Sequence, residues 1–224
     1  MSKQRPSTYY CVLFAICRGD FLAQTDGLPR IIVCSRHAAR PVFVFMSRDF
    51  FPTESLQLFG FADDYSFGVL QSSFHWTWAV GVGSKIKDDT RYTSEVWETF
   101  PWPQEPTETQ VSVVAAAARA LRQVREKLMH ENDWSLRDLY QSAEGASTHP
   151  LNDAQAALDA AVADAYGMPP DQSPTEFLLE LNELVAEDEE QGQKVRGPGL
   201  PDHLDPTDPR WFSTDCIEPP PVGS

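Results

Sequence analysis

The tripeptide Pro101-Trp102-Pro103 constrains the fold of this chain more than any other feature. Proline has a fixed φ and no amide N–H, and it disfavours helical backbone in the residue before it. No helix can therefore run through these residues. Short β-branched and aromatic runs precede them, and alanine-rich segments follow. We predict an α+β fold with a small antiparallel β-rich module over residues 1–104, a helical module over 105–190 and a disordered tail over 191–224.

Three short runs in the first half have the composition of β-strands. Residues 9–17, 30–35 and 41–46 are rich in aromatic or β-branched side chains, and turn residues such as Asp26 and Gly27 separate them. Pro41 stands at the start of its run, where a strand tolerates proline. Three such runs joined by short polar stretches predict a small antiparallel sheet.

Residues 67–80 have the spacing of a helix instead. Phe67, Leu70, Phe74 and Trp78 fall on one helical face. We predict one helix over this range, capped by Ser66 and ended by the Gly81-Val82-Gly83 stretch.

The second half carries three helix patterns. Residues 107–129 are rich in Ala, Arg and Leu, with Thr107 or Thr109 as the predicted cap. Residues 152–166 form an alanine-rich segment that Gly167 stops. A third helix begins at Ser173-Pro174-Thr175-Glu176, which has the residues of a capping box. Its acidic end, residues 187–190, places like charges at the negative pole of the helix, so we expect it to fray.

The tail contains seven prolines in thirty-four residues, together with Gly and Asp. This composition is typical of disorder. Trp211 and Phe212 within it are the residues that we expect to form a small docking element.

Charge is distributed unevenly along the chain. Residues 1–104 carry ten basic and ten acidic side chains, whereas residues 105–224 carry eight basic and twenty-three acidic ones. Nucleic-acid binding depends on Lys and Arg contacts to phosphate. Any contact with DNA should therefore lie before about residue 104.

No pattern of residues points to catalysis. The sequence has no GxGxxG or GxxxxGK[ST] loop, no HExxH and no GxSxG. We interpret His75 as a core or interface residue, and the pairs Asp63-Asp64 and Asp88-Asp89 as solvated caps or turn formers. We predict no catalytic residue and no metal site in this chain.

The cysteines and the apolar runs bear on the compartment. Cys11, Cys17, Cys34 and Cys216 have no CxxC spacing, which favours a reduced protein with buried thiols. The run at residues 9–17 follows Lys3 and Arg5 but lacks a signal-peptide cleavage pattern. No run approaches the roughly 18 apolar residues of a membrane span. We expect a cytoplasmic protein without membrane contact.

Four elements, in order, resemble the end of fused type II restriction–modification DNA methyltransferases of the Mme-like group. The first is FGVLQSS with His75 and Trp78, the second is Arg91-Tyr92-Thr93, and the third is TFPWP, which ends at Pro103. The fourth is the stretch LNDAQAALDAAVADAYG, which is similar to the helical C-terminal domain of that group. The resemblance covers about residues 28–186. Residues 1–27 match nothing in that group, and we predict that residues 1–104 together form part of a target-recognition domain.

The resemblance implies a site-specific, adenine-N6 DNA methyltransferase that uses S-adenosylmethionine. Family members carry a Gly-rich loop for that cofactor and an (N/D)PP(Y/F) motif upstream, and neither occurs in this sequence. We therefore expect no cofactor in this chain and no activity from it alone. The chain looks like a truncated or split gene product, with double-stranded DNA and a separate methyltransferase chain as its expected partners.

Within this interpretation, five cationic residues are the candidate DNA contacts. Lys85, Lys87 and Arg91 come first, because they cluster just after the predicted helix, and Arg36 and Arg40 come second. The alternative is that they are ordinary solvated charges that balance Asp88 and Asp89.

Aromatic and small side chains near these cations have packing roles in our interpretation. We assign Ser72, Ser73 and Trp78 to packing. Trp97, Phe100 and Trp102 are expected to anchor the junction between the two halves.

Two other hypotheses stay open from the sequence. One is an acidic helical protein-interaction module, in which the second half and its aromatic tail bind a partner. The other is a non-functional remnant. The recognised bases, and whether cleavage accompanies methylation, are not readable from the residues.

Overall fold

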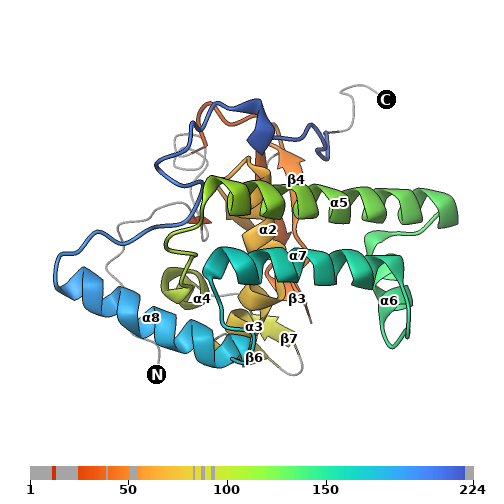
Figure 1. Ribbon diagram of the computed structural model, residues 1–224. Coiled ribbons are helices and arrows are strands. Elements are labelled where there is room, and N and C mark those ends of the chain that lie inside the picture. Colours follow the sequence, from red (N-terminus) through yellow and green to blue (C-terminus); the bar gives the residue numbers. More distant parts are fainter. Residues whose placement is uncertain are drawn as a thin grey trace.

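The chain changes at residues 101–103 from a part with strands and short helices to a part with long helices, as predicted (Figure 1). The structure is a computed structural model. It describes residues 12–13, 25–38, 40–50, 55–82, 84–86, 89–91 and 94–219. Two antiparallel sheets occupy the first part of the chain and long helices the second. The α+β class is confirmed.

The larger sheet has four antiparallel strands in the order β1-β5-β2-β4. They are β1 (Val12–Leu13), β2 (Arg30–Ser35), β4 (Val44–Ser47) and β5 (Leu56–Phe59). Each of the three predicted runs overlaps one strand, and β2 has the predicted limits. Strand β5 was not predicted, because its four residues include no β-branched side chain to mark it.

Both faces of this sheet are covered. Along β2, Ile32 and Cys34 belong to the main core, whereas Ile31 and Val33 belong to a smaller cluster on the opposite face. This alternation is the period of two that a strand imposes. The sheet is therefore a rigid base for the segments that leave its ends.

The predicted helix over residues 67–80 is two helices, so that prediction was wrong. Helix α2 (Asp64–Gln71) ends at Ser72, whose backbone is extended, and α3 (Ser73–Val82) starts directly after it. The Ser72 hydroxyl donates to the Val69 carbonyl at 2.7 Å, which helps to satisfy the end of α2. The four apolar residues of the predicted helical face are nevertheless all buried: Phe67, Leu70, Phe74 and Trp78.

The cap of α2 also differs from the prediction. Asp63 is the N-cap, and its carboxylate accepts hydrogen bonds from the amide and the hydroxyl of Ser66 at 2.7 and 2.8 Å. Aspartate and serine are both good capping residues, and here the helix starts earlier than the sequence analysis assumed, so that the aspartate takes the capping position.

Helix signals in the second half were more reliable. Thr107 and Ser173 are the N-caps of α5 and α8, and Thr107 forms a full capping box with Gln110. Helix α8 stays helical through its acidic end, where we expected fraying. Helix α4 (Ser94–Thr99) still belongs to the first half, and the helices of the second half are α5 (Glu108–Asn132), α6 (Leu136–Ala143), α7 (Pro150–Tyr166) and α8 (Pro174–Glu190).

One main core draws side chains from both halves of the chain. Val111, Val114 and Ala118 of α5 are fully buried in it beside residues of α2 and the larger sheet. Trp97, Phe100 and Trp102 lie in the same core, as expected for the junction. The two halves of the chain, which differ in secondary structure, are therefore packed against each other through one core.

The prediction of a disordered tail was wrong for residues 191–219. Trp211, in the short 3-10 helix η1 (Pro209–Trp211), is 1% exposed, and its indole N–H donates to the Asp205 carbonyl at 3.1 Å. Leu204 is buried too. Proline and glycine prevent regular helix or strand here, but they do not prevent packing, and a single buried tryptophan supplies much apolar area. Residues 220–224 lie outside the described part of the chain.

No helix within the described residues is long and apolar enough to cross a membrane.

Candidate nucleic-acid interface

A second, three-stranded sheet brings the two groups of predicted contact residues together. It consists of β3 (His37–Ala38), β7 (Asp89–Arg91) and β6 (Ser84–Ile86), in that order. His37 stands opposite Arg91, and Arg91 stands opposite Ser84. Lys85 stands opposite Thr90, which pairs on its other side with Ala38. We call these three strands the basic sheet.

Four of the five candidate cations can be placed relative to this register. Arg36 is the residue just before β3, and Arg40 comes two residues after it. Lys85 lies in β6 and Arg91 in β7, where the structure describes the backbone and not the side chains. Lys87, which follows Ile86 of β6 in the sequence, lies outside the described residues. The structure thus joins segments that are about fifty positions apart in the sequence.

The larger sheet fixes one side of the basic sheet. Strand β2 ends at Ser35 and β3 begins at His37, so Arg36 alone connects the two strands. The Arg36 amide donates to the Ser55 carbonyl at 2.9 Å, which holds this connection against the start of β5. In Figure 1, β7 and β6 lie on the lower side of the molecule, and the C-terminal segment crosses the upper side.

Arg40 has a neighbour in the helical half. It is half-buried, and its charge lowers the pKa of Asp159 on α7, although burial is the larger influence and raises that pKa overall. The Asp159 carboxylate also accepts the Ser73 amide at 2.8 Å. Arg40 therefore supports the contact between the halves electrostatically, whatever else it binds.

His75 is a core residue, as the sequence indicated. It is fully buried, and its Nδ1 lies 2.9 Å from the Leu70 carbonyl oxygen, which requires Nδ1 to carry the proton. Burial lowers the pKa of His75 to about 3, so the ring is neutral at physiological pH. Its ring packs against Phe43 and Phe100.

The prediction that Asp63 and Asp64 are solvated was wrong. Asp63 is 5% exposed and Asp64 is fully buried. Burial raises the pKa of Asp63 to about 6, against the hydrogen bonds from Ser66. Asp89 of the other pair lies in β7, and Asp88 lies outside the described residues.

Asp64 is the centre of a buried group of charges that the sequence did not reveal. Its carboxylate pairs with Arg30 of β2 at 3.4 Å, with Arg119 of α5 at 2.8 Å and with Arg122 of α5. Asp215 pairs with Arg122 at 2.6 Å and with Arg30 at 3.6 Å. We call these five side chains the arginine–aspartate cluster. Only Arg119 and Arg122 share an element, so no local spacing could have indicated it.

The arginine–aspartate cluster holds separate parts of the fold together. Its arginines are fixed on aromatic faces: the Arg30 guanidinium lies 3.5 Å from the centre of the Phe45 ring, and that of Arg122 lies 4.4 Å from the Phe67 ring. Its carboxylates are paired, and none of its groups lines the pocket that the structure describes. It joins β2, α2, α5 and the C-terminal segment.

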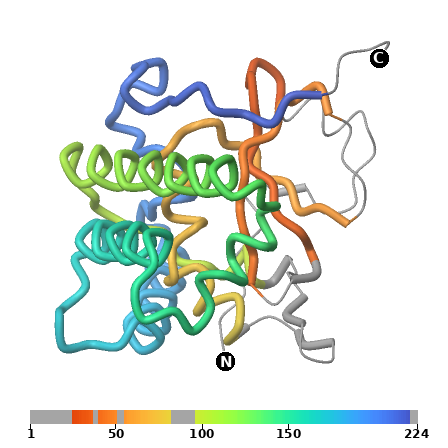
Figure 2. The backbone as a smooth tube through the Cα atoms, turned by 90° about the vertical axis from the view of Figure 1, so that its right-hand side faces the viewer, coloured from red at the N-terminus to blue at the C-terminus, as the bar shows by residue number. Residues whose placement is uncertain are grey.

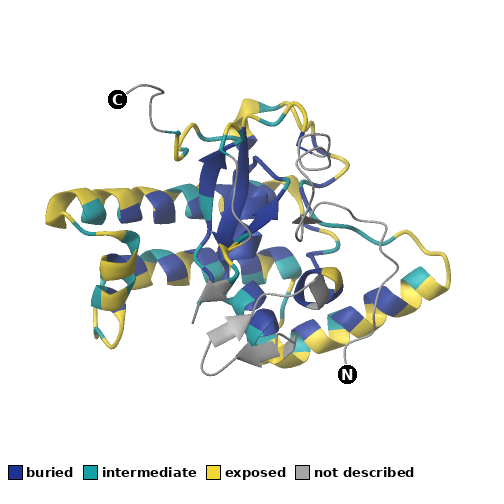
Figure 3. Ribbon diagram, turned by 180° about the vertical axis from the view of Figure 1, so that it is seen from behind, coloured by how far each residue is buried: buried dark blue, intermediate teal, exposed yellow. Residues whose placement is uncertain are grey.

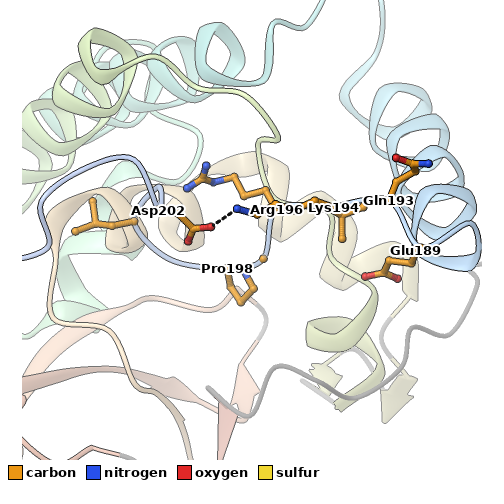
Figure 4. A pocket seen from close by; sticks show the side chains of 10 residues that line it. Glu189, Gln193, Lys194, Arg196, Pro198 and Asp202 are labelled. Atoms are coloured by element: carbon orange, nitrogen blue, oxygen red, sulfur yellow. Dashed lines mark ion pairs between the residues drawn. The ribbon is translucent and has the colours of Figure 1, made fainter.

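A pocket of about 420 Å³ lies where the chain leaves α8 (Figure 4). Its charged side chains are two acids, Glu189 and Asp202, and two bases, Lys194 and Arg196. Lys194 and Asp202 pair at 3.1 Å. Because the charges balance, nothing in the pocket favours an anion such as a phosphate. Over the described part of the chain, no group of three or more metal-ligating side chains occurs.

Comparison with known proteins supports the assignment of the first half to a target-recognition domain. The family model of the MmeI target recognition domain matches residues 29–104. This range contains β2 to β7 and helices α2 to α4, and it contains all five candidate contact residues.

Two relatives extend the similarity into the helical half. DNA methyltransferase A of Bacillus subtilis (strain 168) is 32% identical over 129 residues, which is 56% of this chain and 14% of the relative. A solved structure of the type IIL restriction-modification enzyme MmeI in complex with DNA aligns with a TM-score of 0.61 and 26% identity. That alignment covers 69% of this chain and 21% of the other. The chain therefore spans a small part of each relative, and the resemblance inferred from the sequence is confirmed.

Proposed function

Because residues 29–104 form an Mme-like target-recognition region, we propose that this chain holds a specific site of double-stranded DNA for a restriction–modification methyltransferase. The observation that carries the proposal is the basic sheet. Its strand register gathers Arg36, Arg40, Lys85 and Arg91 from two distant segments into one small unit. That unit lies inside the range that matches the family.

The charge distribution also favours DNA contact through the first half of the chain, on the side of the basic sheet. Residues 105–224 have twenty-three acidic and eight basic side chains, and helix α8 alone has seven acidic residues and no basic one. Figure 3 shows the outer side of α8 as largely exposed. Such a surface repels phosphate, whereas the first half is neutral overall and has four of its ten cations, Arg36, Arg40, Lys85 and Arg91, on or beside the basic sheet.

The cations have different roles in the proposal. Lys85, Lys87 and Arg91 contact phosphates or base edges of the target, because a short β-hairpin can enter the major groove. Arg36 contacts the backbone beside them. Arg40 has a second role in supporting the basic sheet against α7, through the charge of Asp159.

The chemical step belongs to another part of the enzyme. The sequence holds neither a Gly-rich loop nor an (N/D)PP(Y/F) motif, so its residues do not fit S-adenosylmethionine. In the proposed function the methylated base is an adenine, modified at N6 after it leaves the duplex, and this chain keeps the duplex in register while that occurs. A methyltransferase domain supplied by a separate chain is the partner.

Binding to DNA can be measured directly. We expect the full chain, alone or with a methyltransferase partner, to raise the fluorescence anisotropy of a labelled mixed-sequence duplex at low salt. The variant Arg91→Gln should bind several-fold more weakly. The matched control is Arg137→Gln, which removes an exposed arginine on α6. Equal effects of the two variants, or no binding in either setting, would contradict the proposal and favour a protein-interaction module or a remnant.

A further inference from the structure

Residues 213–217, which belong to the C-terminal segment, contact both halves of the chain. Figure 2 shows this segment, in dark blue, passing along α5 toward the strands of the larger sheet. Side chains at positions 213 and 215 meet the arginine–aspartate cluster, and the backbone at position 217 pairs with β4. The spacing of two is the period of an extended strand. We call residues 213–217 the C-terminal strand.

Two arginines recognise the polar groups of this strand. Arg122 Nε donates to the Asp215 carboxylate at 2.6 Å, and Arg30 Nη1 donates to the Asp215 carbonyl at 2.7 Å. The Ser213 hydroxyl accepts from Arg122 at 2.8 Å and donates to Asp64 at 2.7 Å. Burial alone would raise the pKa of Asp215, but the hydrogen bond and charge of Arg122 bring it below its ordinary value. The carboxylate is therefore ionised at neutral pH.

The backbone contact completes the recognition. The Ile217 amide donates to the Phe45 carbonyl at 3.0 Å, and the Ser47 amide donates to the Ile217 carbonyl at 2.9 Å. Ile217 stands opposite Met46 in a parallel bridge. Strand β4 is the last strand of its sheet, so this bridge covers an edge that would otherwise present free backbone groups. Adding a strand to a sheet edge is a general way to bind an extended peptide.

The charges of the cluster require such an occupant. Without Asp215, three guanidinium groups would face the single carboxylate of Asp64. Arg30 and Arg122 are 4% and 8% exposed, and within the described residues Arg122 Nη1 is buried without a hydrogen-bond partner. Aromatic rings hold both guanidinium groups in place. The site is thus preformed for a carboxylate and would lack one negative charge if it were empty.

We propose that Arg30, Arg122 and the outer edge of β4 form a binding site for an extended acidic peptide, and that the chain fills this site with its own residues 213–217. The C-terminal strand is then a separable latch. Its side chains contact α5 and its backbone contacts the larger sheet, so this one segment adds a further connection between the helical half and the recognition half. This proposal does not depend on DNA binding.

The test uses the full chain with a weakened latch. In Ser213→Ala/Asp215→Asn, the Ser47 and Ile217 amides should exchange with solvent at least tenfold faster, while the amide of Leu121 in α5 keeps its rate. The control Asp202→Asn makes the same change on an exposed carboxylate of the C-terminal segment, and it should leave all three rates unchanged. Unchanged exchange in the double variant would overturn the proposal.

A peptide added in trans tests recognition itself. A synthetic peptide of residues 211–219, mixed with the double variant, should restore the protection of Ser47, and the same peptide with asparagine at position 215 should bind at least tenfold more weakly. Equal binding of both peptides would overturn the proposal. So would restoration by inorganic phosphate alone, or dimerisation of the wild-type chain through exchanged C-terminal strands. If the double variant does not fold, Ile217→Pro removes the amide that donates to Phe45 and restricts the backbone beside it, and it should accelerate exchange at Ser47 while Leu121 keeps its rate.

Discussion

Replacing Gly68 by alanine adds one methyl group where α2 lies against α5 and α7. An ideal Cβ at this position would lie 2.7 Å from Cγ1 of Val114, and 3.3 Å from both Ala118 Cβ and Leu158 Cδ1. All three neighbours are fully buried. Valine is stiff about χ1, so its methyl group cannot turn away at little cost. The added methyl therefore has to move two helices apart.

Two opposing effects set the magnitude. Alanine is better than glycine inside a helix by about 1 kcal/mol, whereas overpacking a core by a methyl group typically costs about 1–3 kcal/mol. We expect Gly68→Ala to lower the free energy of unfolding by about 1 kcal/mol. The matched control is Gly81→Ala in α3, where a Cβ would meet nothing within 4 Å. This second substitution should raise the free energy of unfolding, by as much as about 1 kcal/mol.

Urea unfolding followed by far-ultraviolet circular dichroism measures both changes. The two variants should move the midpoint in opposite directions at the same m-value. Val114→Ala in the Gly68→Ala background should cost less than it does alone, by about 1 kcal/mol, because it removes the clashing methyl. If Gly68→Ala were as stable as Gly81→Ala, the close packing of α2 on α5 would be wrong.

Three further substitutions probe buried groups. Trp211→Ala should lower the free energy of unfolding by about 3–5 kcal/mol in the same assay, since the indole is buried. A change near zero would instead support the prediction of a disordered tail. In His75→Asn, which keeps a donor for Leu70, stability should fall as pH rises from about 4 to 6. This is the contribution of Asp63, whose folded pKa of about 6 lies above its unfolded value. In Asp63→Asn, which keeps the helix cap, stability should instead rise with pH over the same range, by about 1.4 kcal/mol per unit. The cause is His75, whose folded pKa of about 3 lies below its unfolded value. In the wild type the two slopes offset each other, and a variant with the wild-type profile would contradict the assignment.

Local signals in the sequence predicted the elements that depend on neighbours along the chain. The limits of β2 and the caps Thr107 and Ser173 were correct because side-chain type and spacing alone determine them. The break at Ser72 was missed because the apolar spacing continues through it. Trp211 was expected to dock and does so, but its partners were not predicted, because they lie far away in the sequence and composition says nothing of them.

In the candidate interface too, the residues were predictable from the sequence, whereas contacts between distant segments were not. The two cationic groups were visible as residues, but strands of two and three residues are too short to show a period, so the pairing of β3 with β7 was not predictable. The arginine–aspartate cluster was not predictable either, since its members come from four separate segments.

The salt dependence of DNA binding tests the central claim most directly. Removing one phosphate contact reduces the slope of log K against log salt by about 0.9. For Lys85→Gln/Lys87→Gln/Arg91→Gln we predict a smaller slope than that of the wild type, by about 0.9 for each of the three cations that contacts a phosphate and so by at most about 2.7. For the control Lys127→Gln/Arg137→Gln/Arg210→Gln, which removes three exposed cations outside the basic sheet, we predict the wild-type slope. Equal slopes for both triple variants would contradict the assignment of DNA contact to the basic sheet.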